Sequence, residues 1–113
     1  MIEAYHFGSI TIDGRRYQAD IKIVNGRVVT DWWRQQAHVL NVFDVDDILV
    51  AAPEILIVGM GQPGMMRVAE TLRATLVASG IELTEEPTAK AVQSFNRLCL
   101  EGKRVAAAFH LTC

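Results

Sequence analysis

Residues 55–64 are Ile55-Leu56-Ile57-Val58-Gly59-Met60-Gly61-Gln62-Pro63-Gly64, an unbroken apolar run followed at once by a glycine-rich turn. An apolar run without the alternation of a half-exposed strand is typical of a strand covered on both faces in an α/β sheet. In such folds, binding sites lie in the loops that follow the central strands. The stretch therefore predicts a buried central strand at 55–58 and places a candidate site in the turn at 59–64.

Helices and strands are expected to alternate downstream of this turn. Apolar residues at helical spacing predict one helix that ends at Gly80, and another that begins at a Thr88 cap and ends at Gly102. A short strand is expected at 81–83 between them. The final segment, 104–112, contains a run of alanines that would let helices pack closely on both sides, so it predicts a second central strand.

The first third of the chain has the period-two alternation of β-strands. It is interrupted by Asp13-Gly14 and Asn25-Gly26, dipeptides that favour tight hairpins because their residues tolerate positive φ angles. These signals predict a three-stranded β-meander, with strands before residue 13, at 17–23 and from residue 28 onward. After the meander, Asn41 is expected to cap a short helix that Pro53 ends.

The predicted elements follow the order βββ-αβαβαβ. This order indicates an α/β fold: a single three-layer domain over residues 1–113, with a mixed central sheet and an N-terminal β-meander. The chain has 113 residues, of which 50% are hydrophobic. This is enough apolar material for one core, and the chain is too short for two independently packed cores.

Composition excludes several classes of function. The net charge is −2 and no block of lysines or arginines occurs, so the basic surface of a nucleic-acid-binding protein is missing. The longest apolar run, 55–60, is far shorter than the roughly 20 residues that span a bilayer, so the protein is not expected to be membrane-embedded. Two cysteines, Cys99 and Cys113, are too few for a disulfide scaffold and fit a reducing cytoplasm.

The turn carries a pattern that has three interpretations. Gly59, Gly61 and Gly64 match the G-x-G-x-x-G dinucleotide fingerprint, with a predicted strand before them and a predicted helix after. Pro63, however, lacks a backbone N–H for phosphate, and the chain has room for only one mononucleotide-sized half. The alternatives are a small anionic ligand at this turn, or a tight structural turn without a ligand.

A second candidate group lies between residues 32 and 38. Trp32, Arg34 and His38 fall on one side of an extended segment, where an indole, a guanidinium and an imidazole would suit a carboxylate or phosphate. The alternative is that Trp32 and Trp33 anchor the core and Arg34 forms a local ion pair.

No catalytic constellation is visible. Ser9, Ser79 and Ser94 lack any nucleophile motif. His110 and Cys113 are three apart on a predicted strand, so their side chains would lie about 10 Å apart on opposite faces and could not bind one ion. We therefore predict no catalytic residue, no metal and no cofactor.

Groups of residues along the chain occur in the order found in one family. They are Phe7-Gly8 with Ile10 and Ile12, Trp32-Trp33-Arg34 with His38, the run from Pro53 to Gly61, Pro87-Thr88 with Ala91-Val92 and Asn96, and the ending from Gly102 to Cys113. By these motifs the chain resembles, over nearly its whole length, the small α/β domain family of unknown function that includes mitochondrial complex I assembly factor three and the adipogenesis-associated domain protein.

The resemblance implies a three-layer domain with a mixed sheet, and it implies no established activity for bacterial members. The mitochondrial relative is a protein-binding assembly factor and not a catalyst, so we expect a protein partner and a non-enzymatic binding or assembly role, for example toward a respiratory complex. The turn Gly59-Met60-Gly61 departs from the commoner Gly-Thr-Gly and so lacks a hydroxyl that could face a ligand. The alternative is a small anionic-ligand or nucleotide-binding protein, or an undiscovered enzyme, that uses the turn at 59–64.

Overall fold

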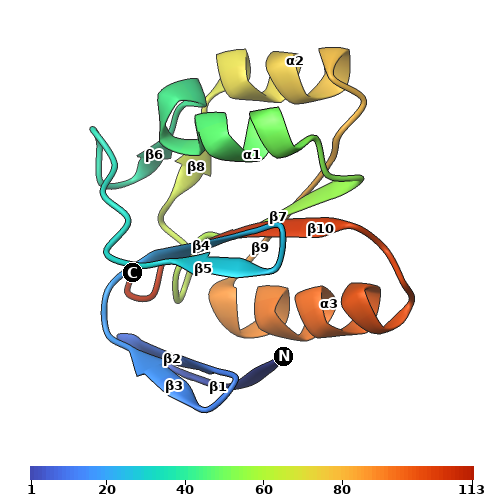
Figure 1. Ribbon diagram of the computed structural model, residues 1–113. Helices are drawn as coiled ribbons and strands as arrows, with labels where there is room; N and C mark the ends of the chain where they lie inside the picture. Colours follow the sequence, from blue (N-terminus) through green and yellow to red (C-terminus); the bar gives the residue numbers. More distant parts are fainter.

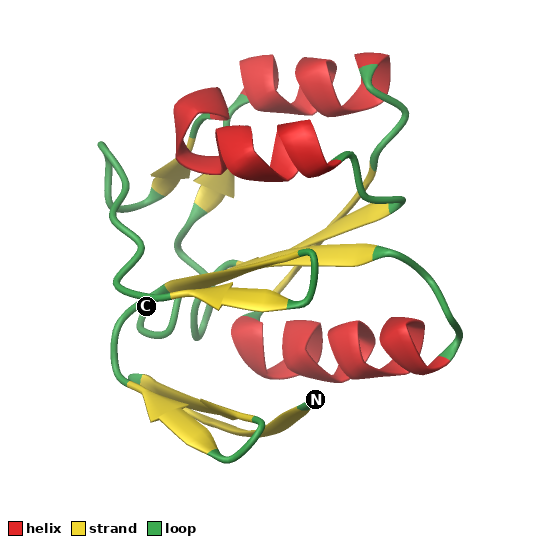
Figure 2. Ribbon diagram, viewed as in Figure 1, coloured by secondary structure: helices red, strands yellow, loops and turns green.

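Three layers make up the structure, a computed structural model that describes residues 1–113. A five-stranded sheet forms the middle layer, with two short helices on one face and one longer helix plus a small N-terminal sheet on the other (Figure 1; Figure 2). The helices are α1 (Asp46–Ala51) and α2 (Glu70–Ala78) on the first face and α3 (Thr88–Leu100) on the second. This architecture confirms the predicted α/β domain with a mixed sheet.

The central sheet has the strand order β5-β4-β10-β7-β9. Its strands are β4 (Ile21–Val24), β5 (Arg27–Val29), β7 (Ile55–Gly59), β9 (Glu82–Glu86) and β10 (Val105–Phe109). β7, β9 and β10 are parallel, whereas β4 runs antiparallel to β10 and continues through a hairpin into β5. The strands predicted at 55–58, 81–83 and 104–112 are thus present, and the last two form β9 and β10.

The N-terminal meander is confirmed, but its strands are not those expected. It consists of β1 (Ile2–His6), β2 (Ser9–Ile12) and β3 (Arg15–Tyr17), which form a separate sheet beside α3. The strand predicted at 17–23 is wrong, because the chain leaves this sheet after Tyr17 and enters the central sheet at Ile21. The alternation of apolar residues continues across the break and therefore hides it.

The segment after the glycine-rich turn also differs from its prediction. Two-residue strands β6 (Val39–Leu40) and β8 (Arg67–Val68) pair in parallel, so a strand and not a helix directly follows the turn. A 3₁₀ turn (Val42–Val45) precedes α1. Thr88 is the first residue of α3 and not its cap, since the cap position is Pro87. None of the three α-helices has both the length and the apolar character that a bilayer crossing needs.

Two apolar cores lie on opposite faces of the central sheet. Along β7, Ile55 and Ile57 pack with α3 and the N-terminal sheet, whereas Leu56 and Val58 pack with α1 and α2. All four side chains are buried. The prediction that this apolar run is covered on both faces is therefore confirmed, and β7 joins the two cores.

Shortening a side chain of β7 should destabilise the whole domain. Leu56→Ala is expected to lower the free energy of unfolding by about 2–5 kcal/mol, because it removes buried methyl groups and leaves a cavity in a closed layer. Val77→Ala, at an exposed position of α2, is the control and should change the value by less than about 0.5 kcal/mol. Urea unfolding followed by circular dichroism measures both, and equal effects of the two variants would contradict this account of the core.

Candidate functional site

Four segments meet at one edge of the central sheet. The parallel strands β10, β7 and β9 all end there, at Phe109, Gly59 and Glu86. β4 runs the other way and begins at the same edge, directly after Asp20. The topology therefore gathers Asp20, His110 and the glycine-rich turn, although they are far apart in sequence.

A buried polar cluster occupies this edge, which we call the edge cluster: Asp20, Arg34 and His110. The Asp20 Oδ2 atom accepts a hydrogen bond from Arg34 Nη1 at 2.8 Å and lies 2.7 Å from His110 Nδ1. Its Oδ1 atom accepts from the Leu111 amide at 2.8 Å. Arg34 and His110 are only 7% and 6% exposed. The Asp20 side chain is 16% exposed, so the cluster is a compact network in which the cation and the imidazole are buried and the carboxylate is partly buried.

The surroundings of Asp20 favour its ionised form. Burial raises the pKa of its carboxyl, but hydrogen bonds from His110, the Leu111 amide and Arg34 together outweigh burial, so the pKa lies below its ordinary value. With the carboxylate charged, His110 Nδ1 is assigned as the proton donor to it. The other nitrogen, Nε2, is buried without a hydrogen-bond partner.

Arg34 has its donors engaged by the protein itself. Its Nε and Nη2 atoms donate to the Ala37 carbonyl at 3.2 and 2.7 Å, and its guanidinium lies 4.8 Å from the centre of the Trp32 ring. Trp32 donates from Nε1 to the Asp44 carbonyl, which also accepts from the buried Lys22 ammonium. The local ion pair predicted as one alternative for Arg34 is present, with Asp20 as its partner.

The side chains of residues 32–34 alternate between the inside and the surface. Trp32 and Arg34 are buried, whereas Trp33 is 80% exposed. The expectation that both tryptophans anchor the core is therefore wrong for Trp33, because a side chain between two inward neighbours in an extended segment points outward.

His38 reaches the edge cluster through ring contact. Its side chain is exposed, and its ring packs edge-on against His110 with 5.6 Å between centroids. Trp32 therefore contacts Arg34 directly, whereas His38 is linked to Arg34 only through His110. The two residues that join them, Asp20 and His110, were missed as site residues. The only sequence signals for them are their positions: Asp20 directly precedes the apolar strand β4, and His110 directly follows the apolar strand β10.

The glycines of the turn are required by neighbouring parts of the chain. A Cβ atom on Gly59 would lie 2.7 Å from a Phe109 ring carbon. One on Gly61, whose φ angle is +99°, would lie 2.5 Å from the Thr112 carbonyl oxygen and 2.8 Å from His110 Cδ2. Gly64, at φ +120°, has no such close neighbour. The turn therefore touches the edge cluster at His110.

Most amides of the turn already have partners. The Met60 amide donates to the Glu86 carbonyl, and the Gln62 amide donates to the Thr112 carbonyl. The Gly61 amide donates to Thr88 Oγ1 at 2.9 Å, and the same hydroxyl donates to the His110 carbonyl at 2.6 Å. A phosphate would have to replace these bonds. This geometry favours the tight structural turn among the three interpretations.

Two shallow clefts are both lined by Gln35, and one of them borders the exposed Trp33. One, of about 290 Å³, lies beside Trp33, Arg34 and Ala37. The other, of about 540 Å³, lies beside Gln36 and Phe43. Phe43 is 76% exposed, so two large aromatic side chains stand on this part of the surface.

The fold and this site define a small three-layer α/β domain whose sheet edge is closed by a buried acid–imidazole–guanidinium network. The chain belongs to the family described as protein of unknown function (DUF498/DUF598), whose profile matches residues 2–110. The resemblance to a small α/β family of unknown function is thereby confirmed.

Solved structures of this kind match along the whole chain. The protein MT938 is 29% identical, with a TM-score of 0.83, and the match covers 100% of this chain and 98% of that one. The conserved hypothetical protein PH1505 from Pyrococcus horikoshii OT3 is 28% identical, with a TM-score of 0.83 and coverage of 100% and 99%. A protein from Bordetella pertussis, described as an Mth938-like domain, is 22% identical at a TM-score of 0.74, covering 98% and 85%, and shares the fold.

Removing the charge of Asp20 should destabilise the domain in a pH-dependent way. Asp20→Asn is expected to lower the free energy of unfolding by about 3–5 kcal/mol at pH 7, because it leaves Arg34 buried without its anion. The carboxyl has a lower pKa folded than unfolded, so its stabilisation is full above the unfolded value of about 3.9 and is lost as the pH falls through the folded value. Urea unfolding at a series of pH values should therefore show that the difference in the free energy of unfolding between wild type and variant becomes smaller from neutral to acid pH.

Asp13→Asn is the matched control for this series, since Asp13 is exposed and pairs with the N-terminal amine. It should change the free energy of unfolding by less than about 1 kcal/mol. A gap between wild type and Asp20→Asn that stays constant down to low pH would contradict the charge-based account.

Gly61 should tolerate a side chain less well than a glycine in an open turn. Gly61→Ala and Gly26→Ala both place alanine at a positive φ angle, but a Cβ at Gly26 meets nothing within 4 Å. Gly26→Ala should lower the free energy of unfolding by about 1 kcal/mol through backbone strain. Gly61→Ala should lower it clearly more, because the new Cβ also crowds His110 and Thr112. Thermal unfolding measures the stability of both variants, and the difference between them is the effect of crowding. Equal losses of stability would show that crowding is not the reason for glycine at position 61.

Proposed function

We propose that this protein is a non-enzymatic binding module that docks onto another protein through an aromatic face, defined by Trp33, Gln35, Gln36 and Phe43. The observation that carries the proposal is the 80% exposure of Trp33 between two buried neighbours, Trp32 and Arg34. Exposed tryptophans on a fixed backbone are frequent energetic centres of protein interfaces.

The aromatic face is held ready for binding. Trp32 is fixed by its hydrogen bond to the Asp44 carbonyl, and Arg34 is fixed by Asp20 and the Ala37 carbonyl. Little backbone freedom is therefore lost when Trp33 is covered, which favours affinity. The cleft beside Trp33, and the second cleft that shares Gln35 with it and reaches Phe43, offer space for side chains of the partner.

The partner that fits this face has an apolar hollow for the indole, with polar groups around it for Gln35 and Gln36. The family that the chain resembles includes a mitochondrial protein that assembles complex I, and this relative supports a more specific partner. We therefore propose a subunit of a respiratory or other membrane complex, bound while that complex matures in the cytoplasm.

A small anion at the turn of residues 59–64, bound with help from Arg34 and His38, remains the alternative. It has less support, because Arg34 already donates to Asp20 and Ala37, and the amides of Met60, Gly61 and Gln62 donate within the chain.

Trp33→Ala should weaken capture of the partner without unfolding the domain. Affinity purification from the native cell in mild detergent is expected to recover a respiratory or membrane-complex subunit with the wild type. The variant should weaken that binding about 30-fold, equivalent to about 2 kcal/mol, because it removes an interface centre. Leu100→Ala, an equally exposed apolar position on α3, is the control and should leave recovery unchanged.

Two results would contradict the proposal. One is the absence of any respiratory or membrane-complex subunit among the captured proteins, together with normal complex I activity in a deletion strain. The other is equal recovery of such a subunit by wild type and Trp33→Ala, which would place binding elsewhere on the domain.

A further inference from the structure

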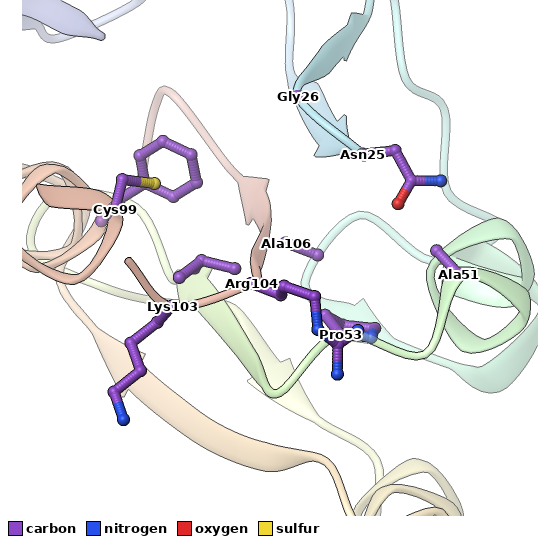
Figure 3. Close-up of a pocket in the computed structure, with 10 residues that line it drawn as sticks. Asn25, Gly26, Ala51, Pro53, Cys99, Lys103, Arg104 and Ala106 are labelled. Carbon is purple, nitrogen blue, oxygen red and sulfur yellow. The ribbon is translucent and has the colours of Figure 1, made fainter. Parts of the chain in front are cut away.

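A third concavity lies at the opposite edge of the central sheet from the edge cluster. It is a cleft of about 280 Å³ beside the start of β10, which we call the end cleft (Figure 3). The tip of the β4–β5 hairpin, the end of α1 and the last turns of α3 surround it. None of its residues belongs to the edge cluster or the aromatic face, so its occupant is independent of the proposed function.

The walls of the end cleft are apolar. Phe95 and Cys99 of α3 form one side, Ala106 of β10 lies at its base, and Ala51 and Pro53 lie on the far side. Figure 3 shows the Cys99 sulfur directed from α3 toward the cleft. Burial raises the pKa of this thiol, so it stays neutral at physiological pH and acts as part of the apolar wall. An apolar ligand body would therefore be well accommodated.

Hydrogen-bond donors stand at the mouth of the end cleft. Arg104 Nη1 donates to the Ala52 carbonyl at 2.8 Å, which holds the guanidinium beside Pro53 (Figure 3). The Asn25 side chain makes no hydrogen bond within the protein, and Figure 3 shows its carboxamide extending toward Ala51 across the mouth. Glu54 is 4.0 Å from Arg104 Nε but does not line the cleft. Lys103 also lines the end cleft, but its ammonium points away from the other labelled residues (Figure 3). The mouth thus carries one fixed cation and one free amide.

We propose that the end cleft binds a small organic monocarboxylate with an apolar body, whose carboxylate is received by Arg104 and Asn25. A guanidinium forms its strongest hydrogen bonds with carboxylates, and apolar walls with a few placed polar groups are the usual form of a small-molecule site. The volume lies at the lower limit of such sites, about 300 Å³, which excludes dinucleotides and drug-sized molecules. Benzoate is a suitable probe, because it joins one carboxylate to a compact apolar ring.

Titration of the ¹⁵N-labelled protein with benzoate tests the proposal. Saturable shifts are expected at the amides of residues 25–26, 51–52 and 103–106, with a dissociation constant in the millimolar range. Benzyl alcohol, which keeps the ring and lacks the charge, should bind about tenfold more weakly. Absence of saturable shifts in the end cleft, or equal binding of both probes, would overturn the proposal.

Two exposed cations give a matched pair of variants. Arg104→Gln should weaken benzoate binding about tenfold, because it removes the charged donor at the mouth. Lys103→Gln removes the charge of another lining residue, but the ammonium of Lys103 points away from the other labelled residues in Figure 3, so binding should change by less than about threefold. Equal losses in both variants would mean that general charge attraction, and not the end cleft, holds the anion.

A chemical readout locates the ligand independently. In the Cys113→Ser variant, Cys99 is the only thiol. Benzoate should slow its reaction with a maleimide in proportion to occupancy, whereas benzyl alcohol at the same concentration should protect less. Unchanged Cys99 reactivity at benzoate concentrations that saturate the amide shifts would contradict binding in the end cleft.

Discussion

The carboxylate of Asp20 is the single group on which the arrangement of the sheet edge depends. It bonds to Arg34, 14 residues later, and to His110 and the Leu111 amide, 90 and 91 residues later. It therefore fixes the entry into β4, the extended segment around Trp32 and the exit from β10 relative to one another. Burying such a network brings little net stability over an apolar core of the same size, because desolvation offsets the attraction. Its effect is to select one arrangement of three chain segments.

This fixed geometry explains why a dinucleotide-like glycine pattern occurs in a turn with its amides already bonded. Glycines in nucleotide-binding loops provide tight turns and let the backbone approach pyrophosphate. Here the close approach is made by the chain itself, since Phe109 crowds Gly59 and the pair His110 and Thr112 crowds Gly61. Thr88 completes the arrangement by bridging the Gly61 amide and the His110 carbonyl. Packing therefore accounts for the glycines at 59 and 61, whereas Gly64 has a positive φ angle and no close neighbour.

Local patterns predicted the central layer well, because its strands carry their signal in consecutive residues. The apolar run of β7 and the alanines of β10 indicate burial on both faces without reference to the rest of the chain. The break between β3 and β4 has no such signal, because alternation continues through it and the turn is set by bonds from Asp20 to distant segments. For His110 the sequence suggests only the role of a metal ligand, because its partner Asp20 lies 90 residues away.

The engagement of Arg34 and the exposure of Trp33 have a common origin in the edge cluster. Asp20, Ala37 and Trp32 together occupy the donors and the face of the Arg34 guanidinium, so little of it is left for an external anion. The same contacts hold residues 32 and 34 inward, and the extended backbone then directs Trp33 into solvent. The binding of an anion by Arg34 and the presentation of Trp33 to a partner are therefore competing uses of one segment. The hydrogen bonds present in the structure engage Arg34 and so disfavour the first.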